Sequence, residues 1–205
     1  MERIIGSPFH SLSRAVDLLC LNLGQEVDWT SSRGENRRMP TYSIHFQTQW
    51  RFVRNGRIVL ASQDIYEPFA PAQAGEDWEY DLVGRPAVES SRFDVLASGL
   101  SRRLRESTVA ACRVSPLGDL SLAFSNGICF ESFTPSSLQE EVWRLVDYQT
   151  GEHLVVFDGE KPRQMDPRLV LRALQELSGW IGPDDCLEQV MEQLEHYDEL
   201  TTQEL

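Results

Sequence analysis

Residues 42–52 alternate between apolar and polar side chains, which is the pattern of a β-strand with one buried face. An Asn-Gly pair follows at Asn55-Gly56, and a second apolar run comes after it. Asn-Gly between two apolar runs is the strongest short-range signal for a β-hairpin, because a type I′ turn needs positive φ at both central residues. A weaker stretch of the same kind, residues 120–133, turns at Asn126-Gly127. The sequence therefore predicts two β-hairpins with defined turns.

Each predicted hairpin is followed by a loop and then by acidic residues and a tryptophan, Trp78 in the first case and Trp143 in the second. We interpret the two units, about residues 41–84 and 108–159, as an internal duplication of a β-meander. The simpler alternative is chance, because hairpins are common and tryptophans often lie in cores. Two copies are too few to indicate a solenoid.

Apolar residues at helical spacing predict helices around these hairpins. An N-terminal helix is expected over residues 8–23, a connecting helix over 90–105, and a pair of helices within 163–205. The predicted fold class is therefore α+β, with antiparallel β-meanders in two pseudo-repeats, an N-terminal helix, a connecting helix and a C-terminal αα-hairpin. Residues 1–162 would form the β-rich domain, with the helical pair packed on it.

Composition and charge narrow the possible partners. The chain has 205 residues, of which 41% are hydrophobic, and a net charge of −13. This charge argues against nucleic acids and anionic membrane surfaces, which attract basic proteins, and it is compatible with a basic protein partner. The charge is also uneven: residues 184–204 contain eight acids and no cation. Residues 33–57 contain one acid and six arginines, namely Arg33, Arg37, Arg38, Arg51, Arg54 and Arg57. This basic stretch can meet the acidic tail within the molecule or bind an anionic ligand, and an intramolecular contact or simple solvation is the simpler interpretation.

Known catalytic and cofactor motifs are not found in the sequence. There is no nucleophile elbow, P-loop or dinucleotide fingerprint, so no cofactor is expected. The four cysteines form no CxxC and have mostly apolar neighbours, which predicts free thiols in a reducing compartment. No metal site is expected. His45 and His153 lie on predicted strands and can converge, but isolated strand histidines are the simpler interpretation. With neither a signal peptide nor a transmembrane run predicted, we expect a cytoplasmic protein.

One cluster resembles a ligand site more than any other, namely the first hairpin with the acid and the tyrosine that follow it. An ion pair between Asp64 and an arginine of the hairpin is the simpler alternative. The tryptophans are expected in the core, and one that lined an open groove would be a binding platform. The candidate ligand-binding residues are Arg51, Arg57, Asp64, Tyr66, Trp78 and Trp143.

The strings WRFVRNGRIVLASQDIYEP and SNGICFESF, the latter followed by EEVWRL, resemble a family of uncharacterised bacterial proteins. The match covers about residues 42–157. The resemblance implies the duplicated β-unit, and it brings no known activity, catalytic residue or cofactor.

Three functions follow as hypotheses. The first is a non-catalytic acidic protein that binds a basic protein, for example as an immunity or regulatory factor; that example rests on analogy with small acidic bacterial proteins. The second is a small anionic ligand bound at the arginine-rich first hairpin. The third is a hydrolase that uses one of the paired carboxylates, although adjacent acids on a strand point to opposite faces and solvated acids are the simpler interpretation.

Overall fold

The computed structural model describes residues 1–31, 34–81, 86–135, 141–157 and 163–165. The chain divides into two compact units, Met1–Gln164 and Met165–Leu205. The fold below is that of the first unit. The predicted C-terminal αα-hairpin lies outside the described residues.

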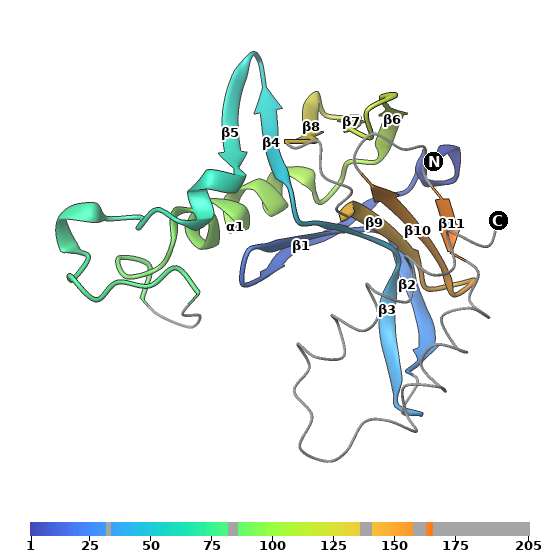
Figure 1. Cartoon of the computed structure of the whole chain (residues 1–205), viewed down its shortest axis with the longest axis horizontal. Coiled ribbons are helices and arrows are strands. Elements are labelled where there is room, and N and C mark those ends of the chain that lie inside the picture. Colours follow the sequence, from blue (N-terminus) through green and yellow to red (C-terminus); the bar gives the residue numbers. More distant parts are fainter. Residues whose placement is uncertain (32–33, 82–85, 136–140, 158–162, 166–205) are drawn as a thin grey trace, which may run out of the picture. The chain divides into compact units, whose positions relative to one another are not determined.

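Antiparallel strands in two sheets dominate the structure, and strand accounts for 52% of it (Figure 1). The six-stranded sheet has the order β1-β2-β3-β9-β10-β11, and the five-stranded sheet has the order β5-β4-β8-β7-β6. The strands of the first sheet are β1 (Phe9–Ala15), β2 (Leu18–Thr30), β3 (Asn36–Phe46), β9 (Glu141–Asp147), β10 (Glu152–Phe157) and β11 (Arg163–Met165). Those of the second sheet are β4 (Gln49–Arg54), β5 (Arg57–Ala61), β6 (Val109–Val114), β7 (Leu120–Phe124) and β8 (Ile128–Phe133).

The described part contains one α-helix, α1 (Arg92–Leu104), and three short 3-10 helices, η1 (Glu2–Ile4), η2 (Ser62–Ile65) and η3 (Pro71–Gln73). The connecting helix is therefore confirmed. Ser91 caps its N-terminus, where the side-chain oxygen accepts a hydrogen bond from the backbone N–H of Asp94 at 3.2 Å. Nevertheless the α+β fold class was wrong, because most of the described structure is sheet.

The predicted N-terminal helix is the clearest error, because residues 8–23 form the hairpin of β1 and β2. Leu19, Leu21 and Leu23 are fully buried, whereas the residues between them face away from the core. Leucines at positions 19 and 23 satisfy a helical spacing and a strand alternation equally well, so periodicity alone did not separate the two. Pairing with β3 on the other side of β2 favours the strand.

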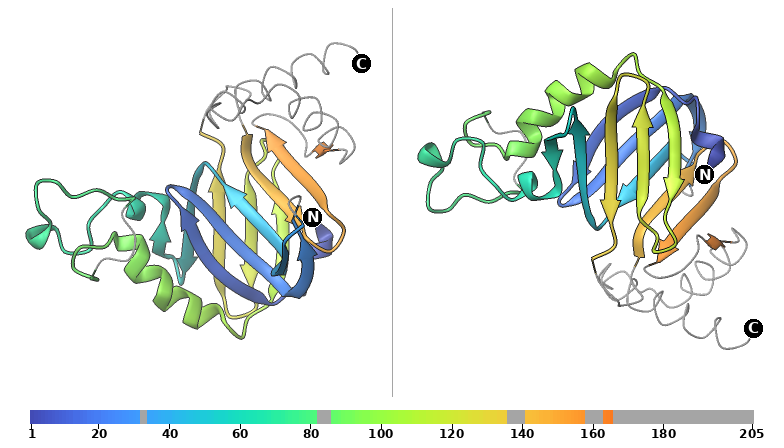
Figure 2. Two further views of the ribbon diagram at one scale, coloured as in Figure 1. Left: turned by 90° about the horizontal axis from the view of Figure 1, so that it is seen from below. Right: turned by 90° about the horizontal axis from the view of Figure 1, so that it is seen from above.

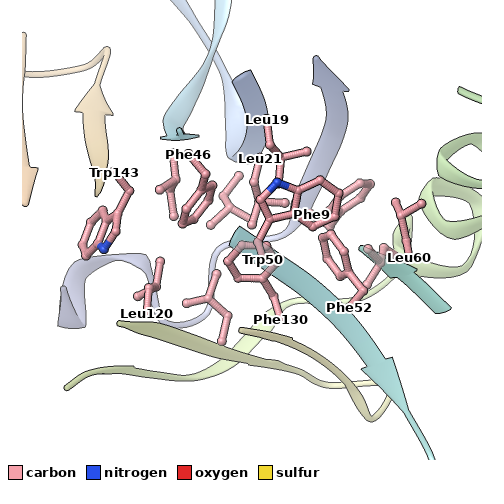
Figure 3. Close-up of a cluster of buried hydrophobic side chains, with 14 of the residues drawn as sticks. Phe9, Leu19, Leu21, Phe46, Trp50, Phe52, Leu60, Leu120, Phe130 and Trp143 are labelled. Atoms are coloured by element: carbon pink, nitrogen blue, oxygen red, sulfur yellow. The ribbon is translucent and has the colours of Figure 1, made fainter. Parts of the chain in front are cut away.

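The core lies between the two sheets, one of which lies in front of the other in the views of Figure 2. The chain passes from one sheet to the other at residues 47–48, between β3 and β4. The alternation of residues 42–52 continues across this crossover because both strands face the same core. The ring of Phe46 lies 4.6 Å from that of Phe130 in the opposite sheet, and Trp50 stacks on Phe130 at 6.4 Å (Figure 3).

Both predicted hairpins are confirmed. Asn55 and Gly56 have φ of 50° and 69°, and Gly127 has φ of 79°. The hairpins are neighbours in the five-stranded sheet because β4 pairs with β8. The strand order is β5-β4-β8-β7, so β5 lies on the same side of β4 as β8 does of β7. Moving the first hairpin two strand positions across the sheet would therefore place it on the second. The two tryptophan segments differ, because Trp143 lies on β9 and Trp78 lies in a loop. The duplication stays a prediction.

Candidate functional site

The segment between η2 and α1, residues 66–90, is the longest connection of the five-stranded sheet, and we call it the acidic loop. It extends away from both sheets (Figures 1 and 2). Residues 66–90 contain six acids and one cation, Arg85, which lies outside the described residues. Every one of the acids is exposed: Glu67, Glu76, Asp77, Glu79, Asp81 and Glu89. None of them forms an ion pair with another described residue. Long loops in compact domains are often functional.

Backbone hydrogen bonds close the base of the acidic loop. The N–H of Phe69 donates to the carbonyl of Ser90 at 2.9 Å, and the N–H of Arg92 donates to the carbonyl of Glu67 at 2.8 Å. Pro68 and Ser91 form an isolated antiparallel bridge between them. The two stems are thus held side by side at the base of the loop.

Arg14 of β1 fastens the middle of the acidic loop to the rest of the unit. Its side chain is only 3% exposed. The guanidinium donates to both carboxylate oxygens of Asp94 at 2.8 Å, to the carbonyl of Tyr80 at 2.7 Å and to the carbonyl of Val16 at 2.6 Å. Burial alone would raise the pKa of Asp94, but hydrogen bonds from Arg14 and Ser91 hold it below its ordinary value. One cation therefore joins the sheet, the helix and the loop.

Aromatic and apolar side chains lie among the acids of the loop. The rings of Tyr66 and Tyr80 are 4.8 Å apart, and the hydroxyl of Tyr66 donates to Asp17 at 3.1 Å. The indole N–H of Trp78 donates to the carbonyl of Glu89 at 2.8 Å. Three aromatic or apolar side chains of the loop are exposed to solvent, namely Tyr66 (40%), Phe69 (38%) and Val88 (41%). The loop thus combines negative charge with the aromatic residues that dominate binding energy in interfaces.

The structure separates the six residues predicted as one ligand site. Tyr66 and Trp78 lie in the acidic loop. Asp64 lies just before it and accepts hydrogen bonds from the N–H of Ala61 at 2.8 Å and from Arg92 at 3.0 Å. It therefore fastens η2 to α1 and pairs with neither arginine of the hairpin.

The other three predicted residues lie elsewhere. Arg51 pairs with Glu131 on β8 at 2.6 Å, and its guanidinium lies over the ring of Phe133 at 4.7 Å from the centroid. Arg57 begins β5, whereas Asp64 follows its far end, so the two are a strand length apart. Trp143 is fully buried and donates to the carbonyl of Gly118 at 2.7 Å, which is a core role.

Sequence reasoning did not identify Phe69, Val88, Arg14 or Asp94. The signal that could have indicated the loop is its high content of acidic and aromatic residues, which is apparent in the sequence. No local signal links Arg14 to Asp94, because 80 residues separate them along the chain.

His45 and His153 do come close on the outer face of the six-stranded sheet. Arg144 of β9 is paired with His45 of β3 and with Val155 of β10, and His153 lies two residues before Val155. Burial and the charge of Arg144 lower the pKa of both imidazoles. No group of three or more metal-ligating side chains occurs among the described residues.

Because of these two histidines, we expect the folded protein to become less stable at mildly acidic pH. Their pKa values in the folded state lie below the ordinary value of 6.5, so the unfolded chain takes up protons first as the pH falls. The free energy of unfolding should therefore decrease when the pH is lowered from about 7 to about 5. Urea denaturation at several pH values measures this slope. His45→Gln/His153→Gln should flatten it, and an unchanged slope in this double variant would refute the assignment.

The comparisons with known proteins add no relatives: no family model matches the chain, and neither a curated protein nor a solved structure is significantly similar to it. The resemblance to an uncharacterised bacterial family stays a prediction. In the part of the chain that the structure describes, no helix has the length and apolar character needed to cross a membrane.

Proposed function

We propose that this is a non-catalytic binding protein and that the acidic loop is its surface for a basic protein partner. The observation that carries the proposal is the composition of the loop surface. Six exposed carboxylates share the loop with the exposed side chains of Tyr66, Phe69 and Val88, and of these carboxylates only Asp81 interacts electrostatically with a described cation, Arg14. Such a surface is complementary to a patch of lysine and arginine around apolar residues.

The anchoring of the loop supports the same function. A loop that is ordered before binding loses less conformational entropy when the complex forms. Closure of its base and the hydrogen bond from Arg14 to Tyr80 hold these described parts of the loop in place. The carboxylates also speed the encounter with a basic protein through long-range attraction, which salt weakens.

The hypothesis drawn from the sequence relied on the acidic residues 184–204, whereas the binding surface proposed here is the acidic loop. Residues 184–204 lie outside the described part of the chain. We place the protein in the cytoplasm, and support for this comes from the three cysteines that the structure describes, Cys20, Cys112 and Cys129, which are free thiols. Burial raises the pKa of Cys112 to about 11, which makes that thiol unreactive at neutral pH. An immunity or regulatory role remains a hypothesis within this proposal.

The test uses two variants with the same change in net charge. Glu76→Gln/Asp77→Asn removes two acids from the loop, and Glu2→Gln/Glu106→Gln removes two exposed acids outside it. A basic partner is first captured from the native cell extract at low salt. Its affinity is then measured with purified components by isothermal titration calorimetry. We expect the loop variant to bind about tenfold more weakly and the control variant to stay within about twofold.

If both variants bound the partner equally more weakly, the affinity would depend on net charge alone, and the loop would be refuted as the binding surface. Unchanged affinity in the loop variant would refute it as well. As an independent check, a photo-crosslinking residue replaces Phe69 or, as the control, Leu117, which is 62% exposed in the turn between β6 and β7. The partner should crosslink at the first position only.

A further inference from the structure

A second charged surface, of the opposite sign, lies at one end of the five-stranded sheet, and we call it the basic end. It is formed by the tip of the β4–β5 hairpin and the last turn of α1. Arg54 pairs with Ile128 at the start of β8, and the side chain of Asn126, two residues earlier, donates to the carbonyl of Arg103 at 2.7 Å. The two segments therefore meet beside the turn of the second hairpin. The arginines of the basic end are Arg54, Arg57, Arg102, Arg103 and Arg105.

All five arginines are exposed, and none forms an ion pair with a residue that the structure describes. The segments that meet there contain one acid, Glu106. The other arginines near the first hairpin differ in this respect. Arg37 pairs with Glu35 and Arg38 lies near Glu26, while Arg51 pairs with Glu131. The basic end is thus a locally positive surface on a chain whose net charge is −13.

The arrangement of the hairpin tip is unfavourable for stability. Arg54 and Arg57 lie directly opposite each other across the Asn-Gly turn, and like charges in this position destabilise a hairpin. Arginines in the last turn of α1 are favourable with the helix dipole, so those alone need no further explanation. The opposed pair on β4 and β5 has no such compensation in the fold. Next to it, Ile58 is 60% exposed.

We propose that the basic end binds an acidic segment of a partner protein. Guanidinium groups bind carboxylates with two parallel hydrogen bonds, and Ile58 offers an apolar contact beside them. The hairpin tip projects from the sheet (Figure 1), so this surface suits an extended segment better than an enclosed small molecule. A short peptide feels mainly the charges within about 8 Å at physiological salt. A long nucleic acid is also repelled by the net charge of the whole chain, which favours the peptide.

This proposal is independent of the acidic loop. Arg57 begins β5 and the loop follows its other end, so the two surfaces lie at opposite ends of that strand. One molecule can therefore hold a basic protein at one end and an acidic segment at the other. Failure at either surface leaves the other unaffected.

The test uses the full chain and a fluorescein-labelled oligoglutamate peptide of about ten residues, with binding followed by fluorescence anisotropy at low salt. We expect Arg54→Ser/Arg57→Ser to weaken binding about fivefold or more. Arg37→Ser/Arg38→Ser carries the same change in net charge and should stay within about twofold, because these arginines already have acidic neighbours. Arg102→Ser/Arg105→Ser should weaken binding to an intermediate extent. The variants change exposed side chains only, and thermal unfolding confirms that each is folded.

Three results would overturn the proposal. The first is the absence of peptide binding by the unmodified protein. The second is an equal loss in the tip variant and the Arg37/Arg38 control, which would leave only net charge. The third is tighter binding of an oligothymidylate of equal charge that is lost in the tip variant, because it would assign the surface to nucleic acid.

Discussion

Replacing Phe130 by Ala is expected to lower the free energy of unfolding by about 4 kcal/mol, which approaches the total stability of many small domains. Phe130 is fully buried and links the two sheets. Its ring lies 4.6 Å from Phe46 of the opposite sheet, 5.0 Å from Phe52 and 6.4 Å from Trp50. These neighbours are held by their own strands and cannot close the cavity, so the full cost of the void remains.

Urea denaturation followed by tryptophan fluorescence measures this effect, because Trp50 and Trp143 are buried reporters. Phe130→Leu serves as a second variant if the alanine protein does not fold, and it should cost about 1–2 kcal/mol. Phe133→Ala removes a similar ring from the outer face of the same strand and should cost clearly less than Phe130→Ala. Equal costs for the two alanine variants would contradict the central position of Phe130.

Replacing Arg14 by Met is expected to cost about 3 kcal/mol. The side chain of Arg14 is 3% exposed, and that of Asp94 is 28% exposed, so the pair is only partly screened by water. Methionine keeps much of the apolar volume but leaves the carbonyl of Tyr80 without its donor and the carboxylate of Asp94 with the hydroxyl of Ser91 as its remaining side-chain donor. Removal of one partner of a buried pair is costly chiefly for this reason.

Two measurements distinguish this role from a general loss of packing. Hydrogen exchange of the backbone N–H groups of residues 76–81 should accelerate in Arg14→Met, because the loop loses its contact with β1. In a double-mutant cycle, Asp94→Asn should cost less in the Arg14→Met background than in the unmodified protein. Strictly additive costs would show that the two side chains are not coupled. The same variant should weaken binding of the basic partner although the carboxylates of the loop are unchanged.

Several elements of this fold follow from local sequence alone. Positive φ at both Asn55 and Gly56, and at Gly127 in the second hairpin, is a backbone that few residues adopt, so the Asn-Gly pairs made both hairpins predictable without tertiary information. Helix α1 was predicted from apolar residues at helical spacing, although Gly99 within it disfavours a helix. The high content of acidic and aromatic residues in the acidic loop is also apparent from the sequence.

The tertiary structure decided the rest. Residues 8–23 carry leucines that suit a helix or a strand, and the pairing of β2 with β1 and β3 selects the strand. The alternating stretch 42–52 looks continuous, yet it is divided between two sheets, because a single core accepts side chains from both. The assembly of each charged surface also depends on distant segments: Arg14 meets Asp94, and Arg54 lies at the same end as α1. Turns and helix caps depend on a few neighbouring residues, so the sequence determined them. Sheet partners and surface clusters depend on burial and pairing between segments far apart in the chain, so only the folded structure decided them.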